Sequence, residues 1–192
     1  MSDFSDFFPA AGGGGGGGIP KYQDFITSGT FTPTQALIDA GGRVSYFVVA
    51  GGQRGLITAG NFSGGSGGEV EYGYMTLTST TGCIVTIGAG GSGSDGTAGA
   101  LSSVAFSSAG GTDITANGGT GDKLGKNWGA YDPQGTGYSG RQTAFSGVND
   151  FSKGGGGVYT GGGVGTPKPN TGCGSKGGID GASGFTRITW FE

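Results

Sequence analysis

Short stretches of this chain alternate between hydrophobic and polar residues, which is the period-two pattern of β-strands. Runs of strand length occur at residues 25–27, 30–32, 43–50, 69–78, 83–87 and 185–191, with sparser signals at 104–106 and 113–115. Helical periodicity is nearly absent, and residues 33–42 are expected to be a connection. The pattern predicts an all-β fold, a small antiparallel β-sandwich whose last strand returns beside the early ones.

Glycine occupies 51 of the 192 positions, far above its usual share of about 7 %. Glycine loses much backbone freedom on folding, so this fold must use positive φ angles or backbones packed where a Cβ would collide. Glycines recur every third residue in the stretches 90–99 and 178–184. A period of three belongs to the polyproline II family of helices, so we predict packed polyglycine II segments. The register soon breaks and proline totals six, which excludes collagen.

Residues 1–20 form a separate N-terminal unit ahead of a glycine-rich β domain at 21–192. An acidic and aromatic peptide comes first, and a tract of seven glycines at 12–18 follows as a tether. The functional hypothesis is that Phe4, Phe7, Phe8 and Pro9 dock into a larger assembly. The alternatives are a disordered terminus or a strap over the protein's own core.

Charge and cysteine content narrow the range of partners. The net charge is −3 and the lysines and arginines are scattered singly, so nucleic acid is not an expected partner. The chain begins without the basic and apolar regions of a secretory signal, and it has no apolar run long enough for membrane insertion. Cys83 and Cys173 are too few for a zinc site. They are expected to be two free thiols or a single bridge.

Enzyme-like motifs occur here without their necessary context. Gly88, Gly90 and Gly93 match G-x-G-x-x-G, but glycine-rich sequence follows where a dinucleotide site needs a helix. Residues 64–68 match G-x-S-x-G, yet the chain has no histidine to act as the base. Glu69 and Glu71 are spaced like a carboxylate pair on one strand face, so a glycosidase is kept only as a remote alternative. We expect no enzyme activity, no cofactor and no metal.

One stretch, residues 126–141, places aromatic rings beside polar side chains. Its candidate contacts are Trp128, Tyr131, Asp132, Tyr138 and Arg141. Aromatic rings stack on the apolar C–H faces of sugars while polar groups bind the hydroxyls, so these residues are candidates for receptor contact. The alternative is that the rings pack between glycine helices or against a neighbouring subunit.

The order of strand, glycine tracts and closing strand resembles the glycine-rich domains of bacteriophage tail fibre and tail-tip proteins. The resembling stretches are residues 25–33, 44–52, 85–93, 154–157, 161–163 and 181–190. The resemblance implies a compact β-portion carrying polyglycine II helices, which serves as a structural or receptor-recognition part of the virion, as in the adhesins of T-even-like phages. This chain differs in that its glycine tracts are interrupted, with Gln53 and Arg54 directly after Gly51 and Gly52.

The resemblance, together with these features, implies a virion structural protein of the tail fibre or tail tip that contributes to host adsorption. It would be made in the host cytoplasm and join other virion proteins through its N-terminal peptide. The small apolar core favours a homo-oligomer, with a trimer as the first expectation. Candidate receptors are a bacterial surface glycan or an outer-membrane protein. The alternative functions are capsid decoration or reinforcement and, from another class, an ice-binding or matrix protein built on polyglycine II.

Overall fold

The structure is a computed structural model that describes residues 18–58, 61–63, 65–94, 96–120, 169–175 and 178–192. Its elements in chain order are β1 (Pro20–Phe25), β2 (Gly29–Phe31), α1 (Gln35–Asp39), β3 (Arg43–Val49), β4 (Leu56–Thr58), β5 (Asn61–Ser63), β6 (Val70–Thr76), β7 (Cys83–Thr86), β8 (Ser102–Val104), the 3-10 helix η2 (Phe106–Ala109), β9 (Ile114–Ala116) and β10 (Phe185–Phe191).

Two antiparallel four-stranded sheets make up the sandwich. One sheet has the order β1-β10-β3-β6 and the other β2-β7-β8-β9, while β4 and β5 form a separate hairpin. The last strand, β10, pairs with β1 on one side and β3 on the other. The predicted all-β sandwich with a returning final strand is therefore confirmed. Its strand bounds differ in detail, since β1 begins at Pro20 and β4 and β5 were not predicted.

The hydrophobic core lies between the two sheets. Alternate residues of β3, such as Val44 and Val48, point into it and are fully buried together with Phe31, Phe106 and Ile188. The intervening residues of β3 point to the opposite face of their sheet, as the pleat of a strand requires. A second, smaller cluster of Phe47, Val49 and Val70 lies on that outer face.

The short helix α1 occupies the stretch that the sequence analysis expected to be a connection. Thr34 caps it, because the Thr34 hydroxyl accepts the Leu37 backbone N–H at 3.1 Å. Gly41 and Gly42 then adopt positive φ angles of 100° and 68° and end the helix. Leu37 is 1 % exposed and closes one end of the core. In the sequence, the signals that could have indicated this helix were the capping Thr34 and the pair Gly41 and Gly42.

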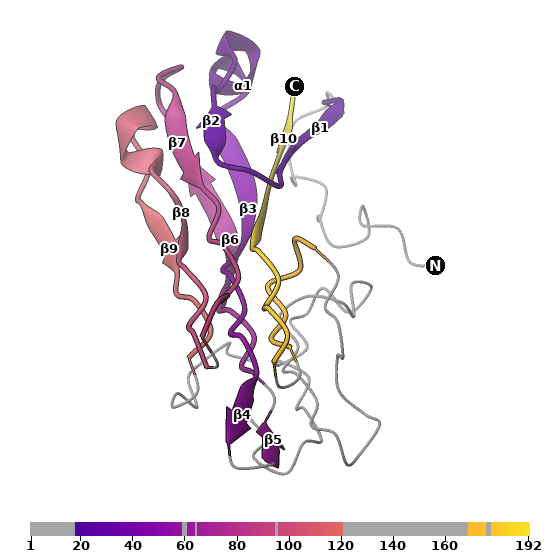
Figure 1. The fold of residues 1–192 in the computed structure, drawn as a ribbon. Helices are drawn as coiled ribbons and strands as arrows, with labels where there is room; N and C mark the ends of the chain where they lie inside the picture. Colours follow the sequence, from indigo (N-terminus) through magenta and orange to yellow (C-terminus); the bar gives the residue numbers. More distant parts are fainter. Residues whose placement is uncertain (1–17, 59–60, 64, 95, 121–168, 176–177) are drawn as a thin grey trace.

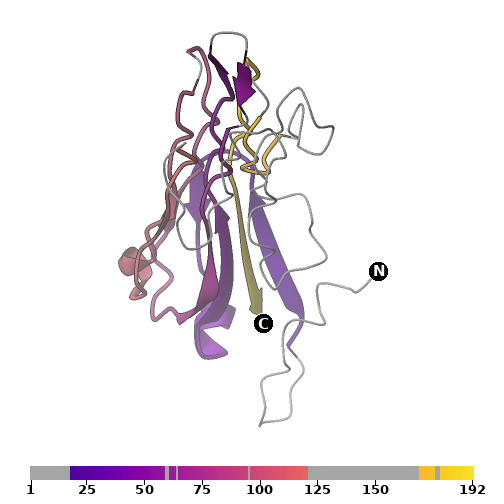
Figure 2. The same ribbon diagram turned by 90° about the horizontal axis from the view of Figure 1, so that it is seen from below.

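Beyond the sandwich, the chain runs as extended glycine-rich segments toward the β4–β5 hairpin and back (Figures 1 and 2). Residues 50–55 are the central segment. Their backbone N–H groups donate in a period of three, to residues 65–69, then 97–100, then 179–182. The bonds are Ala50 to Glu69 and Gln53 to Ser66, Gly51 to Ala100 and Arg54 to Thr97, and Gly52 to Ala182 and Gly55 to Ile179. A β-strand alternates between two sides, so this three-fold pattern is that of polyglycine II.

The carbonyl groups of the central segment bind three further segments. Gly51, Gly52 and Gln53 accept from Gly119, Gly91 and Ser175 at 2.9, 2.8 and 3.2 Å. Among the described residues, the central segment thus has six bonded neighbours, at 65–69, 88–91, 97–100, 117–119, 172–175 and 179–184. These neighbours also bond to one another around a closed ring, through Gly68 to Gly172, Gly172 to Ser183, Gly181 to Gly91, Ala100 to Ala89, Gly99 to Gly119 and Glu69 to Asn117. We call this arrangement the glycine bundle.

Close packing explains the glycines of the bundle. A Cβ on Gly52 would come within 3.0 Å of the Cys173 carbonyl, and one on Gly118 would overlap the Gly99 carbonyl in the same way. The predicted polyglycine II segments are therefore present. However, the glycines that recur every third residue do not all lie in such segments. Gly93, Gly96 and Gly178 have φ angles of 81°, 73° and 76° and lie in turns. The stretch 90–99 is two antiparallel segments joined by a turn.

One buried hydroxyl offers a test of the core. Thr186 on β10 is fully buried, and within the described part of the chain its Oγ1 has no hydrogen-bond partner. Because a buried unpaired hydroxyl is costly, Thr186→Val should stabilise the fold by about 1 kcal/mol and raise Tm by roughly 2–4 °C. Thermal unfolding followed by circular dichroism measures the change.

Thr171→Val is the matched control, because the Thr171 Oγ1 accepts the Cys173 backbone N–H at 3.4 Å. That variant should lose stability. An equal loss in Thr186→Val would mean that its hydroxyl has a partner in solution.

Candidate functional site

The site residues marked by the sequence lie outside the described residues. They are Phe4, Phe7, Phe8 and Pro9 in residues 1–17, and Trp128, Tyr131, Asp132, Tyr138 and Arg141 in residues 121–168. Their roles stay predictions. The structure does show where the two stretches join the fold. Residues 1–17 join the described fold at Gly18. Residues 121–168 connect Thr120 with Pro169, and these two residues lie close in sequence to segments of the glycine bundle.

The two ends of the described fold differ in what they carry. At the sandwich end, Ile19 and Glu192 exchange backbone hydrogen bonds of 2.5 and 3.1 Å, so the start of β1 and the end of β10 lie together. The β4–β5 hairpin lies at the other end (Figure 1). Two turns, at residues 93–96 and near Gly178, lie level with Gly55 because Gly96 and Gly178 donate to its carbonyl. We call the described residues 53–58, 61–63, 92–94, 96–97 and 178–180 the distal end.

Gln53 ties the distal end together. Its side chain is 4 % exposed, and its Oε1 accepts the Ser66 backbone N–H at 3.0 Å. Its Nε2 donates to the Gly96 carbonyl at 3.0 Å. The amide thus joins the central segment to one neighbouring segment and to the 93–96 turn. In the sequence, Gln53 stands out only as an interruption of a glycine tract, because its role depends on contacts that no local pattern reveals.

Arg54, the second interrupting residue, fixes the turn near Gly178. Its guanidinium forms an ion pair with Asp180 and donates to the Gly178 carbonyl at 2.8 Å. The Arg54 side chain is 17 % exposed and that of Asp180 57 %. This pair lies on the wall of a groove, so it also supplies charged groups to the surface.

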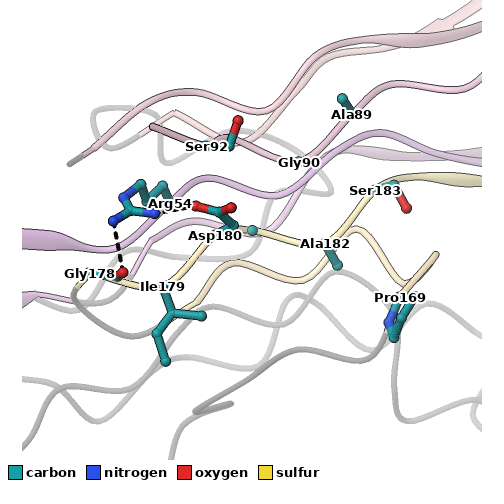
Figure 3. A pocket seen from close by; sticks show the side chains of 11 residues that line it. Arg54, Ala89, Gly90, Ser92, Pro169, Gly178, Ile179, Asp180, Ala182 and Ser183 are labelled. Atoms are coloured by element: carbon teal, nitrogen blue, oxygen red, sulfur yellow. Dashed lines mark hydrogen bonds and ion pairs between the residues drawn. The ribbon is translucent and has the colours of Figure 1, made fainter. Parts of the chain in front are cut away.

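The groove runs along the bundle beside the distal end, with a volume of about 640 Å³. Figure 3 shows the Arg54 and Asp180 side chains close together, with Ser92 on a neighbouring segment and the Ile179 side chain pointing away from the pair. Ser183 and Pro169 lie farther along the groove. Ser92 is exposed, whereas the Ser183 hydroxyl is bound to Asn170 at 2.8 Å. A carboxylate and a hydroxyl beside apolar walls can bind a ligand rich in hydroxyl groups.

The enzyme-like motifs have packing roles in the structure. Gly88 and Gly90 approach the backbones at Ala100 and Gly181, and a turn follows them instead of a helix. Ser66 is 1 % exposed and its hydroxyl donates to the Thr120 carbonyl at 3.2 Å. Neither motif therefore forms the site that its pattern suggests.

Glu69, one residue of the candidate carboxylate pair, has a structural role. The Glu69 Oε2 accepts the Asn117 backbone N–H at 2.8 Å and the Asn117 side-chain amide at 2.7 Å. This carboxylate is occupied in holding two bundle segments together. In the described ranges, no group of three or more carboxylate or cysteine side chains is placed to bind a metal ion.

Cys83 and Cys173 are both free and buried, so the open alternative of a bridge does not apply to this structure. Burial raises the pKa of the Cys83 thiol above its ordinary value, which keeps it neutral and a poor nucleophile near pH 7. Cys83 contributes to the core between the sheets.

No protein-family model, curated protein or solved structure matches this chain. In the part of the chain that the structure describes, no helix has the length and apolar character needed to cross a bilayer.

Proposed function

We propose that this chain is a structural protein of a phage virion, part of the tail fibre or tail tip, which contributes to host adsorption. The observation that carries the proposal is the closed ring of hydrogen-bonded segments around residues 50–55. Such a bundle is stiff, because each backbone is fixed laterally by several others. It separates the end where residues 1–17 join the fold from the end that carries turns and a groove.

That separation suits a part that is attached at one end and meets a surface at the other. The N-terminal peptide would join other virion proteins at the sandwich end. The distal end, with Asp180 and Ser92 beside its groove, would approach a bacterial surface glycan or outer-membrane protein. A weak site suffices, because several copies on one particle bind with avidity. A homotrimer remains our expectation for the assembled form.

Microscopy of the source particle tests the location. Gold-labelled antibody raised against the purified chain should mark the tail tip or fibres of intact particles. Labelling of the capsid would replace the tail assignment with capsid decoration. Absence of label from every particle, with the antibody shown to bind the free chain, would reject the virion proposal.

The adsorption role predicts a specific loss of binding. Trp128→Ala combined with Tyr131→Ala should reduce attachment of the purified chain to host cells by tenfold or more, since buried aromatic contacts often carry 2 kcal/mol or more of a binding interface. Cell pull-down with a fluorescent chain measures attachment, and circular dichroism confirms that the variant folds.

Ile84→Ala is the control for that experiment. Ile84 lies on β7 and is 64 % exposed. It is on the outer face of the β2-β7-β8-β9 sheet, away from the distal end. Its replacement should leave attachment unchanged. If the double variant binds normally, the predicted receptor contacts are wrong, and if it fails to fold, the packing alternative for these rings is correct.

A further inference from the structure

Four strands present an aromatic surface on the outside of the β1-β10-β3-β6 sheet, at the end away from the bundle. Tyr22, Thr189, Ser45 and Tyr74 follow one another across it, as the registers of the three strand pairs show. Tyr22 is 66 % exposed, Tyr74 51 % and the neighbouring Phe191 44 %. We call Tyr22, Arg43, Ser45, Tyr74, Thr189 and Phe191 the aromatic face.

The shape of this face follows from its side chains. Tyrosines stand on the two edge strands, while the two central strands carry smaller residues, Thr189, which is 9 % exposed, and the half-buried Ser45. Neighbouring strands lie about 4.8 Å apart, so the tyrosines are separated by about 14 Å. A low floor between two rings can receive aromatic side chains, which stack or pack edge-to-face at ring distances of about 4.5–7 Å.

The face also carries an uncompensated positive charge. Arg187 lies 4.9 Å from the centre of the Tyr22 ring and is also paired with Asp24 by two hydrogen bonds of 2.6 and 2.7 Å. Arg43, in contrast, lies 5.1 Å from the centre of the Tyr74 ring, and no described carboxylate forms an ion pair with it. An occupant with aromatic rings and a negative charge would therefore complement the face.

We propose that the aromatic face is the docking site of the N-terminal peptide of the same chain, residues 3–9. This peptide has three aromatic rings, at Phe4, Phe7 and Phe8, and two carboxylates, at Asp3 and Asp6. Its rings pack between Tyr22 and Tyr74, and a carboxylate faces Arg43. The proposal does not depend on the proposed function, because both partners belong to this chain.

The connection between peptide and face has a suitable length and starting point. A Cβ on Gly18 would lie 3.2 Å from the Phe191 Cβ, so the chain leaves the described fold at the border of the face. Eight residues, 10–17, separate Gly18 from Pro9, and a glycine-rich linker of that length spans about 15 Å. This matches the width of the face and gives an effective concentration in the millimolar range, which suits a weak contact.

While the N-terminal peptide occupies the aromatic face, it cannot bind a second partner through the same rings. The three phenylalanine rings cannot pack against the aromatic face and against another protein together. The face thus holds the peptide in the free protein, and a partner must displace it.

Chemical modification of tyrosines in the full-length chain tests the proposal. Phe4→Ser, Phe7→Ser and Phe8→Ser combined remove the rings and keep the chain length. Tyr22 and Tyr74 should be nitrated at least threefold more slowly in the wild-type chain than in this triple variant, as measured by mass spectrometry. Tyr46, which packs toward the core, should react equally in both and serves as the internal control.

A charge variant and a free peptide complete the test. Arg43→Glu should raise the nitration rates as the triple variant does, while Thr115→Glu, an exposed position of the other sheet, should not. A synthetic peptide of residues 2–11 should bind the triple variant at least tenfold more tightly than the wild-type chain. Equal nitration rates in the wild-type chain and the triple variant, or equal peptide binding by both, would overturn the proposal. Protection that depends on protein concentration would overturn it too, because it would assign the face to a second copy.

Discussion

A Gly52→Ala variant is expected to lose its cooperative fold or most of its stability. The added methyl group would lie within 3.0 Å of the Cys173 carbonyl carbon and oxygen and of the Gly172 carbonyl oxygen. All three atoms belong to backbone that is itself hydrogen-bonded inside the bundle. No rotamer change relieves such a contact, so the central and neighbouring segments must separate. We expect a cost above about 4 kcal/mol, which is a large part of the stability of an ordinary domain.

Gly29→Ala is the matched control for this substitution. Gly29 lies in β2, and its added Cβ would make only ordinary contacts, 3.5 Å from the Phe25 ring. The control should unfold within a few degrees of the wild-type chain, because Ala is favoured over Gly in a strand interior by about 0.5–1 kcal/mol. Circular dichroism and denaturant titration measure both variants. If Gly52→Ala matches Gly29→Ala in stability, the segments around residues 50–55 are not in close contact in solution.

The contrast between these two glycines shows what the sequence could and could not predict. A count of glycines and a period of three predict that backbones pack closely. They do not identify which glycines pack, since Gly93 and Gly96 share the period of Gly90 and Gly99 but form a turn. The difference arises from the neighbouring segments, which come from distant parts of the chain.

The sandwich was more predictable than the bundle for a related reason. Strands such as β3 and β10 bury alternate side chains, so their burial is visible as a local pattern of hydrophobic residues. The bundle segments are held by backbone hydrogen bonds between closely packed chains, and the glycines that permit this packing show that backbones approach one another without showing which segments are neighbours. Helix α1 was not predicted because its five residues, Gln35–Asp39, are too few for a helical period to emerge.

The same limit applies to the distal end. Gln53 and Arg54 stood out in the sequence only as interruptions of a glycine tract. Their partners, Gly96 and Asp180, lie far along the chain and have no spacing that links them to residues 53 and 54. The sequence therefore directed attention to residues 126–141, whereas the described groove is built from residues that carry no recognisable motif.

Gln53→Leu is expected to destabilise the protein strongly without changing the volume of the side chain much. The Leu side chain would leave the Ser66 N–H and the Gly96 carbonyl without the partners that they have in the structure. A buried group left unpaired, such as the Ser66 N–H, costs about 1–3 kcal/mol, and the half-buried Gly96 carbonyl costs less. We therefore expect a total near 2–4 kcal/mol and a Tm lower by roughly 5–10 °C. Thermal unfolding of the purified variant measures the loss.

Gln53→Glu separates the hydrogen bonds from the packing. A protonated carboxyl group can accept from Ser66 and donate to Gly96, as the amide does, whereas a carboxylate can only accept and would face a carbonyl oxygen. Burial and that carbonyl both raise the folded-state pKa of the new group above the unfolded value of about 4.3. Its stability relative to wild type should therefore be near normal below pH 4 and fall as the pH rises through the folded pKa. Gln53→Leu should show no such recovery at low pH. A constant difference between Gln53→Glu and wild type from pH 4 to pH 8 would mean that the side chain at position 53 is open to water and does not tie the distal end together.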